Sequence, residues 1–431
     1  MRTKILLIPL ACMLAAFSSC SVCHDGPSLE TCPRDTVLRY TLSGEDCTFA
    51  NYAEYGLWVP GGNKPVAGIM VLQHGCTMEV FGITKPYDLQ YQAFARKWNL
   101  AILETALHGP CRVWQHPESG SAAAVLNVLA KASESLNRPE MTDAPWLIWG
   151  HSGGGQWALA MLRDSPERIM AAVSYSAGRD PQWDYSSKVS EVPVLLRHAG
   201  QNDLPFALCE VTAIHAFEKF RALDAPASVV RNVGENHNYS QLRHMMIPFF
   251  ESALRVRLPK RSGGDMRPVT PSKAWLGDTL TFEIFPESGY KGDKSSLCRF
   301  PDKGAAMAWK EYASTNDVMD VTPPPAPGPV TVSVDGDSLL VRWSAEADPE
   351  SGIGCFIIRA DGEEPLRIPE NGDYQSFDRN GDNTYPTDPP AMEARLPRPE
   401  GKRVRITVEN VNQYGLSSKR TVIIRNAGLH K

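Results

Sequence analysis

The segment Gly150-His151-Ser152-Gly153-Gly154 has the spacing G-x-S-x-G, which is typical of a nucleophilic serine in a strand-to-helix turn. Only very small side chains fit beside the serine in such a turn. The apolar run 146–149 precedes it, and a stretch with helical periodicity follows from Gln156. The backbone N–H of Gly153 would then face a developing oxyanion near a helix N-terminus. We therefore expect Ser152 to act as a nucleophile for acyl transfer; a glycine-rich turn without chemistry is the alternative.

A serine hydroxyl needs a base that accepts its proton. Where this turn occurs, the acid and the histidine follow the serine along the chain in that order. Asp203 comes after the apolar run 192–196, and His237 comes after the run 227–230. Both loops would open at the sheet edge at which the serine lies. We expect His237 to be the general base and Asp203 to fix its tautomer and stabilise its charged form.

Other acids and histidines are alternatives to this pair. Asp180 follows the run that ends at Tyr175 and could serve as the acid in a variant arrangement. His215 and His244 fall within predicted helices, where they would be surface or packing residues. His151 is expected to be structural or to line the pocket.

A second oxyanion donor is expected from the loop after the apolar run 69–72. This loop reads Gln73-His74-Gly75-Cys76-Thr77. The His-Gly step lets the backbone turn so that an amide faces the serine, and the N–H of Cys76 is the natural donor. The alternative for the His-Gly step is a simple turn.

These loops must be positioned by a regular framework between residues 51 and 255. Continuous apolar runs there alternate with helical stretches, which predicts an α/β fold with a mostly parallel sheet covered by helices on both faces. The apolar runs lie at 68–72, 100–103, 146–149, 170–175, 192–196 and 227–230. The helical stretches lie at 90–97, 122–136, 156–162, 208–221 and 241–254.

The loop from Leu72 to Thr77, Cys111 near Trp114 and the serine turn resemble the secreted esterases of the poly(3-hydroxybutyrate) depolymerase and feruloyl or acetylxylan esterase group. The resemblance covers residues 52–250. It implies an α/β-hydrolase fold, a serine triad and no cofactor.

The same resemblance implies a disulfide between Cys76 and Cys111, which would rigidify the donor loop; two free buried thiols are the alternative. The chain departs from the group at Gly153, where a bulkier residue is common. It also departs in the long segment 256–322.

The remainder of the chain divides into three parts. Residues 256–321 are less regular and are expected to form an extension packed on the catalytic domain. The proline-rich segment 322–329 predicts a semi-rigid spacer. Residues 330–428 show short strands separated by turns, which predicts an antiparallel β-sandwich.

The sandwich sequence resembles a fibronectin type III-like module. Trp343 lies in an early strand, and 411–418 matches the turn near the end of such a module, although the tyrosine usual before that turn is missing. The module could hold the enzyme near a polymer, but such modules are more often spacers.

The N-terminus indicates export. Arg2 and Lys4 precede the apolar run 5–17, which is too short to span a bilayer, so residues 1–20 form a predicted signal peptide. Cys20 follows two serines as in a bacterial lipobox, so we expect it to be lipidated; simple secretion is the alternative. Residues 21–50 are expected to form a tether.

The composition and net charge of the chain limit the kinds of partner that the protein is expected to have. The chain has 431 residues and a net charge of −5, and it contains no basic stripe, so a nucleic-acid partner is not expected. Outside the leader and Cys20, eight cysteines are scattered without zinc-type spacing, which favours disulfides over a metal. No other run is apolar enough to cross a membrane, so membrane contact is expected only through the lipid.

The sequence therefore predicts an exported serine esterase that acts on acyl groups of a polysaccharide or on polyester fragments. One alternative is a peptidase of the prolyl-oligopeptidase type, although the segment before the first predicted strand is too short for the large N-terminal propeller that those enzymes carry. The other alternative is a non-catalytic glycan-binding lipoprotein. Four tryptophans could line a sugar-binding cleft, although such residues are more often core. They are Trp58, Trp114, Trp157 and Trp183.

Overall fold

The computed structural model describes residues 37–425, except for 63, 78, 80–81, 180–181, 204–207, 238–240, 262, 375–390, 400 and 402. The predicted leader with Cys20 and the alternative acid Asp180 lie outside these described residues. Among the described residues, no helix combines the length and apolar character needed to cross a membrane.

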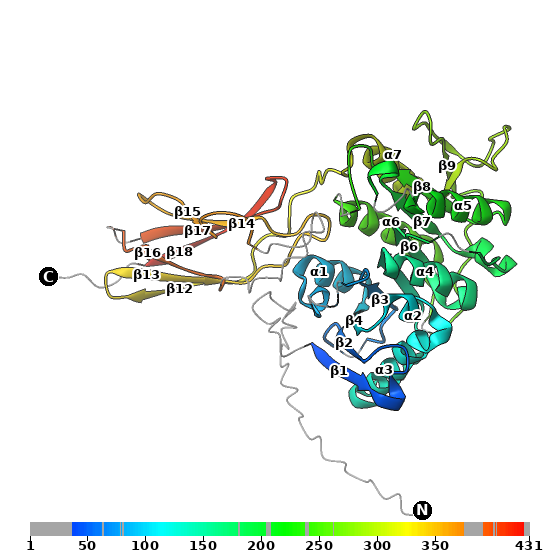
Figure 1. Ribbon diagram of the computed structural model, residues 1–431. Helices are drawn as coiled ribbons and strands as arrows, with labels where there is room; N and C mark the ends of the chain where they lie inside the picture. Colours follow the sequence, from blue (N-terminus) through cyan, green and yellow to red (C-terminus); the bar gives the residue numbers. More distant parts are fainter. Residues whose placement is uncertain are drawn as a thin grey trace, which may run out of the picture.

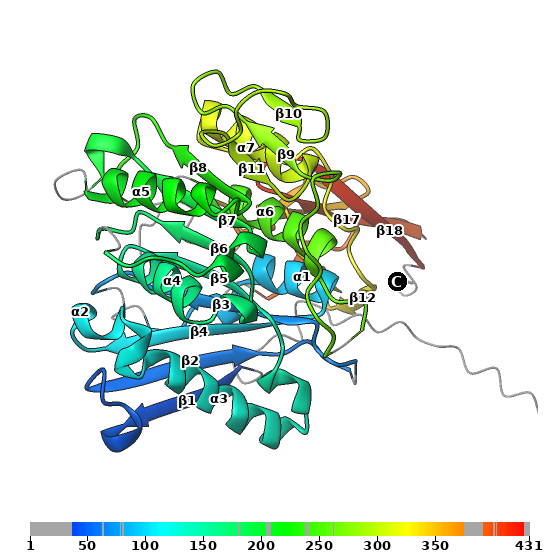
Figure 2. The ribbon, with the colours of Figure 1, turned by 90° about the vertical axis from the view of Figure 1, so that its right-hand side faces the viewer.

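An eight-stranded sheet forms the centre of the larger part of the molecule, in the order β1-β2-β4-β3-β5-β6-β7-β8 (Figure 2). Strand β2 is antiparallel to both of its neighbours, and β3 to β8 run parallel to one another. This is the strand order of the α/β-hydrolase fold, so the predicted fold class is confirmed. The strands are β1 (Leu38–Ser43), β2 (Tyr52–Trp58), β3 (Gly68–Gln73), β4 (Leu100–His108), β5 (Trp146–His151), β6 (Ile169–Tyr175), β7 (Val194–His198) and β8 (Ala227–Arg231).

Helices cover both faces of this sheet. Figure 1 shows α1 and α6 on the face toward the C-terminal sheets, and α4 and α5 on the opposite face. Strands β3, β5 and β6 are therefore buried along their whole length, which is why each reads as an uninterrupted apolar run. The helices are α1 (Leu89–Trp98), α2 (Cys111–Trp114), α3 (Ser121–Leu136), α4 (Gly153–Asp164), α5 (Leu208–Ala222) and α6 (Leu242–Arg257).

Two expectations about the flanking segments need correction. Residues 38–43, expected within a tether, form β1 at the edge of the sheet. The extension 256–321, expected to be less regular, contains helix α7 (Lys303–Thr315) and a small antiparallel sheet. That sheet consists of β9 (Trp275–Gly277), β10 (Ile284–Pro286) and β11 (Cys298–Phe300).

The segment with α7 covers the β8 edge of the main sheet. The indole Nε1 of Trp309 donates to the carbonyl of Val229 at 2.8 Å, and the Cys298 thiol lies against the same residue. A long exposed edge strand is an aggregation hazard, and this cover removes it.

The C-terminal part is an antiparallel β-sandwich, as the sequence predicted. One sheet has the order β12-β13-β16 and the other β15-β14-β17-β18. Its core contains Trp343 packed edge-on against Phe356, with ring centroids 5.2 Å apart. The strands are β12 (Val330–Asp335), β13 (Ser338–Trp343), β14 (Cys355–Ala360), β15 (Leu366–Ile368), β16 (Glu393–Pro397), β17 (Arg403–Val411) and β18 (Ser417–Arg425).

The proline-rich segment 322–329 lies along the sandwich instead of spanning an open gap. The Asn410 amide donates to the carbonyl of Pro325 at 2.8 Å, and the N–H of Gly328 donates to Ser344 at 2.6 Å. A proline has no N–H to donate, but its carbonyl oxygen can still accept a hydrogen bond. The segment is therefore held against the neighbouring strands.

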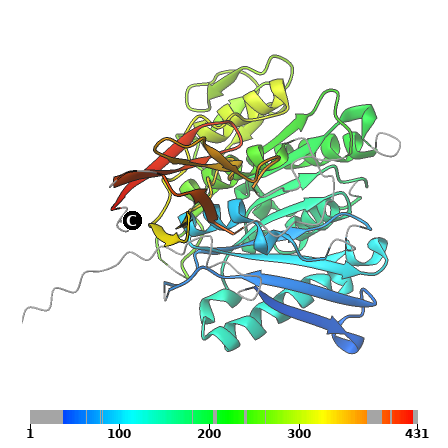
Figure 3. The same ribbon diagram turned by 90° about the vertical axis from the view of Figure 1, so that its left-hand side faces the viewer.

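The sandwich also contacts the larger α/β part directly. Leu89 of α1 is buried in the core of the sandwich, and the Gln90 amide donates to the carbonyl of Glu350 at 2.8 Å. Figure 3 shows the C-terminal sheets in front of the α/β part on this side. The two parts therefore share apolar and polar contacts through α1.

The cysteines differ from the expectation of several disulfides. The structure contains one disulfide among the described residues, between Cys76 and Cys111. The remaining described cysteines are buried thiols outside any disulfide, because each lies in a different part of the core. They are Cys47, Cys209, Cys298 and Cys355.

Candidate active site

Ser152 lies in the sharp turn between β5 and α4. Its backbone has φ 53° and ψ −113°, a conformation that a side-chain-bearing residue adopts only when its surroundings enforce it. The N–H of Ser152 donates to the carbonyl of Tyr175 at 2.7 Å, which ties the turn to β6. A Cβ on Gly150 would lie 2.0 Å from the Gly154 carbonyl oxygen, so the turn excludes larger residues there.

Gly153 is the one glycine of the turn that contacts the disulfide. A Cβ at this position would lie 2.5 Å from both sulfur atoms of Cys76 and Cys111 and 3.0 Å from Trp114. The resemblance to known esterases left the small residue at 153 unexplained. The structure provides the reason, because the disulfide fills the space that a larger side chain would need.

Asp203 and His237 form a hydrogen-bonded pair. The Nδ1 atom of His237 lies 2.7 Å from Oδ1 of Asp203. The other oxygen, Oδ2, accepts hydrogen bonds from the Ser176 hydroxyl at 2.9 Å and from the N–H of Ala199 at 2.7 Å. Burial opposes ionisation of Asp203, but the hydrogen bonds from His237 and Ala199, together with the nearby positive charge of Arg197, hold its pKa below the ordinary value.

Arg197 is a fully buried cation beside this pair, and the sequence analysis did not identify it. Its Nη1 atom lies 3.6 Å from Oδ2 of Asp203 and donates to the Ser176 hydroxyl at 2.7 Å. The same atom donates to the carbonyl of Asn236 at 3.0 Å, and Nε donates to Asn232. Arg197 therefore connects the loop of the acid with the loop of the histidine.

Two further side chains contact His237. The Nε2 atom of His151 lies 2.9 Å from the carbonyl oxygen of His237 and donates to it. Burial and the charge of His237 lower the pKa of His151 to about 3, so His151 is neutral at physiological pH. The Cys209 thiol donates to the carbonyl of Ser176 at 3.2 Å and lies 3.8 Å from His237 Nδ1. The side chains of His151 and Cys209 therefore pack around His237, in agreement with the structural role expected for His151.

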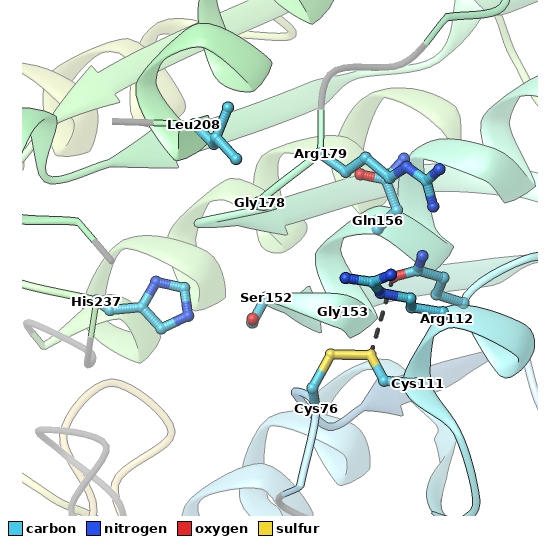
Figure 4. A pocket seen from close by; sticks show the side chains of 11 residues that line it. Cys76, Cys111, Arg112, Ser152, Gly153, Gln156, Gly178, Arg179, Leu208 and His237 are labelled. Carbon is cyan, nitrogen blue, oxygen red and sulfur yellow. Dashed lines mark hydrogen bonds between the residues drawn. A yellow bond between two sulfur atoms is a disulfide. The ribbon is translucent and has the colours of Figure 1, made fainter. Parts of the chain in front are cut away.

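A cavity of about 640 Å³ brings these residues to one surface. Its described lining includes Ser152, Gly153, His237 and the disulfide of Cys76 and Cys111. Figure 4 shows Ser152 between the His237 imidazole on one side and the disulfide on the other. The cavity thus joins the serine turn, the histidine loop and the loop expected to supply the second oxyanion donor.

His74 holds that donor loop in place. Its Nε2 atom accepts a hydrogen bond from the N–H of Leu107 at 2.8 Å. Burial lowers the pKa of His74 to about 4, so the ring stays neutral and can accept this bond. The histidine of the His-Gly step therefore anchors the loop to β4, a role that the sequence analysis did not assign to it.

The other predicted candidates lie away from the cavity. His215 lies in α5, and His244 lies in α6, where its Nδ1 atom is 2.8 Å from Asp317 and 3.0 Å from the Tyr414 hydroxyl. The four tryptophans considered for a sugar cleft are outside the described cavity lining. Trp58, Trp114 and Trp157 are buried, and Trp183 is partly buried.

Two groups of described residues have ligand atoms within 4.8 Å of one another, close enough to hold a metal. The first is Asp203, Cys209 and His237; burial raises the pKa of the Cys209 thiol, so it keeps its proton instead of presenting a thiolate ligand. The second, at the junction with the sandwich, contains Asp320, Asp348 and Glu350.

Comparison with known proteins gives only distant similarities. No family model and no curated protein matches the chain. A thermostable esterase has a TM-score of 0.35 and 17% identity over 46% of this chain and 55% of its own. A ferulic acid esterase has a TM-score of 0.36 and 13% identity over 47% and 91% of the two chains. Poly(aspartic acid) hydrolase-1 from Sphingomonas sp. KT-1 has a TM-score of 0.34 and 14% identity over 47% and 93%.

Proposed function

We propose that this protein is a serine hydrolase that cleaves carboxylic esters through an acyl-enzyme intermediate. The main support is that Ser152, in its strained turn, and His237, which is hydrogen-bonded to Asp203, line the same cavity. Ionised Asp203 holds the proton on Nδ1 of His237, which leaves Nε2 free to act as the base. This combination supports nucleophilic catalysis.

In the first half of the proposed reaction, the Ser152 hydroxyl oxygen attacks the ester carbonyl carbon while its proton passes to Nε2 of His237. The backbone N–H groups of Gly153 and Cys76 stabilise the negative oxygen of the tetrahedral intermediate. The bond to the alcohol oxygen then breaks, and the alcohol leaves with the proton from His237. The acyl group remains bound to Ser152.

In the second half, a water molecule attacks the acyl carbon and gives its proton to His237. The second tetrahedral intermediate collapses, the bond to the Ser152 oxygen breaks, and His237 returns the proton to that oxygen. One ester and one water become one carboxylic acid and one alcohol. The enzyme is restored, so no further reactant is required.

The test is hydrolysis of p-nitrophenyl acetate by the wild type and by Ser152→Ala. Loss of the nucleophile should lower kcat about 10³-fold or more, because triad members act as a unit. Ser187→Ala, on the exposed segment before β7, is the matched serine control and should keep wild-type activity. Equal rates for wild type and Ser152→Ala would remove Ser152 from the mechanism.

The proposed natural substrates are acyl groups on polysaccharides or aliphatic polyester fragments. The support is the resemblance carried by the loop of Cys76, by Cys111 and by the serine turn. Release of acetate, of ferulate and of hydroxy acids from the respective polymers would separate these substrates.

We also propose that the protein is exported and anchored through a lipid on Cys20, with the sandwich as a fibronectin type III-like spacer. The support is the charged and apolar leader and the position of Cys20 behind it. Fractionation of Cys20→Ala tests the anchor: loss of membrane association supports it, and retention contradicts it.

A further inference from the structure

The wall of the catalytic cavity carries positive charge. Its described lining contains Arg112 and Arg179 and no carboxylate side chain. The chain as a whole has a net charge of −5, so the positive charge of this cavity wall is opposite in sign to the net charge of the protein. The nearest acid identified in the site, Asp203, is buried and already bonded to His237.

Neither cation is neutralised by the described part of the protein. Arg112 and Arg179 are exposed, and neither has a hydrogen bond or ion pair to another described residue. Arg163, on α4 of the same domain, differs because it bonds to Asp164 and to Glu118. Two guanidinium groups in one cavity repel each other when, as in the described lining, no carboxylate lies beside them, and an anion between them would relieve this repulsion.

The two guanidinium groups have a defined position relative to the reacting groups. Arg112 follows Cys111 at the start of α2, and Arg179 follows β6. Figure 4 shows both side chains beside Gln156, on the side of Ser152 opposite His237. His237 must protonate the departing alcohol, so the alcohol part of a substrate lies toward His237. The acyl part then extends toward the two arginines.

We propose that the preferred substrates are esters whose acyl part carries a carboxylate, that is, half-esters of dicarboxylic acids. This inference rests on the proposed esterase function and specifies the acyl group for it. Guanidinium groups bind carboxylates through paired N–H donors, in a planar geometry that matches the two carboxylate oxygens. Arg112 and Arg179 determine specificity by binding the distal carboxylate, and they take no part in the proton transfers.

The experiment compares p-nitrophenyl hemiadipate with p-nitrophenyl hexanoate, which has the same chain length and no charge. The wild type should have a kcat/KM about tenfold or more higher for the hemiadipate, since one charge-assisted contact corresponds to about that factor. Arg112→Gln and Arg179→Gln should each lower kcat/KM for the hemiadipate about tenfold, mainly through KM. Their activity on the hexanoate should remain within about twofold, which also shows that they fold.

Controls separate the outcomes. Arg420→Gln, an exposed arginine of the sandwich strand β18, should behave as wild type with both esters. Absence of hydrolysis of both esters by the wild type would overturn the proposed function itself. Hydrolysis of both at equal kcat/KM, unaffected by either variant, would overturn this inference while the esterase function stands.

A second pair of esters tests whether the arginines bind a carboxylate on the acyl part or on the alcohol part of the substrate. The acetyl ester of 4-hydroxybenzoate carries the anion on its alcohol part, and the acetyl ester of 4-hydroxybenzamide is its neutral counterpart. The proposal expects no preference between these two esters. A preference for the benzoate that is lost in Arg112→Gln and Arg179→Gln would overturn the assignment to the acyl part.

Discussion

At the scale of single residues, the proposed catalytic pair of Asp203 and His237 depends on a cation that lies behind it. The carboxylate of Asp203 and the guanidinium of Arg197 are both fully buried, 3.6 Å apart. A buried carboxylate alone would tend to take up a proton, which would deprive His237 of its anionic partner. Arg197 favours the ionised acid, and its bonds to Ser176 and Asn236 also fix the two loops.

Arg197→Met tests this positioning role. Methionine fills a similar volume without charge or donors, so we expect kcat to fall about 10–100-fold with little change in KM. Because the charge of Arg197 favours the ionised form of Asp203, its loss should favour proton uptake by the Asp203–His237 pair, so the acidic limb of the kcat/KM profile should move to higher pH. Arg197→Lys should restore part of the activity.

The matched control for Arg197 is another buried cation far from the cavity. Arg257 donates to the carbonyls of Ile169 and Met170, so Arg257→Met should lower stability and leave the pH profile in place. A pH profile of Arg197→Met identical to that of the wild type would reduce Arg197 to a structural residue.

At the scale of elements, the sequence predicts the centres of strands better than their ends. The apolar runs 68–72 and 227–230 match β3 and β8 closely. Strand β7, however, continues through Arg197 and His198, where the apolar signal stops. Polar residues at the carboxyl ends of these strands are buried because they form the site. Hydrophobicity therefore predicts the secondary structure and burial of these residues less well than those of the strand centres.

The elements that the sequence analysis overlooked carried weaker but readable signals. In strand β1 the apolar residues Leu38, Tyr40 and Leu42 alternate with polar residues, as is typical of an edge strand. In α7 the buried residues Ala305, Trp309 and Tyr312 recur at helical spacing. Asp203 and His237 could be predicted because their loops follow well-marked strands. The contacts of Arg197 and the position of Arg179 in the cavity wall depend on loop paths that no local pattern specifies.

The contact between α4 and the disulfide gives a prediction at this scale. In Gly153→Ala the added methyl group would meet the sulfur atoms of Cys76 and Cys111, so the turn or the donor loop must shift. We expect kcat to fall about tenfold or more, as oxyanion donors are sensitive to displacement. In the Cys76→Ala/Cys111→Ala background the same substitution should cost less, because most of the obstructing atoms are absent.

A double-mutant cycle on kcat measures this coupling. Equal effects of Gly153→Ala with and without the two sulfur atoms would contradict the steric explanation. Ala160→Gly, a buried position later in α4, serves as a control for general loosening of the helix and should show no coupling to the cysteines.

At the scale of the whole molecule, a group of buried acids joins the two parts. Asp320 follows α7, and its Oδ2 accepts hydrogen bonds from Ser351 at 2.6 Å and Asn412 at 2.9 Å in the sandwich. Asp348 lies beside it and accepts from the same Asn412 amide at 3.2 Å. Burial, and then the charge of Asp320, raise the pKa of Asp348 to about 7. One proton is therefore shared within this junction at moderately acidic pH.

This proton makes the stability of the junction depend on pH. Asp348 has a pKa of about 7 in the folded chain against 3.8 for the ordinary group. The folded state therefore binds a proton that the unfolded state lacks between these values, and the contribution of Asp348 to stability falls as pH rises through 7. Buried His74 and His151, whose pKa values are lowered, act in the opposite direction below about pH 6.5.

Comparison with Asp348→Asn isolates the effect of this one group. The amide resembles the protonated acid and carries no charge at any pH, so wild type and variant should unfold at similar temperatures at pH 5. At pH 8 the wild type holds an additional buried negative charge beside Asp320 and Glu350, and the variant should unfold about 2–4 °C higher, which corresponds to about 1 kcal/mol. Calorimetry at both pH values measures this difference. A variant that is destabilised equally at pH 5 and pH 8 would show that Asp348 is ionised throughout, and the acids of the junction would then not share a proton.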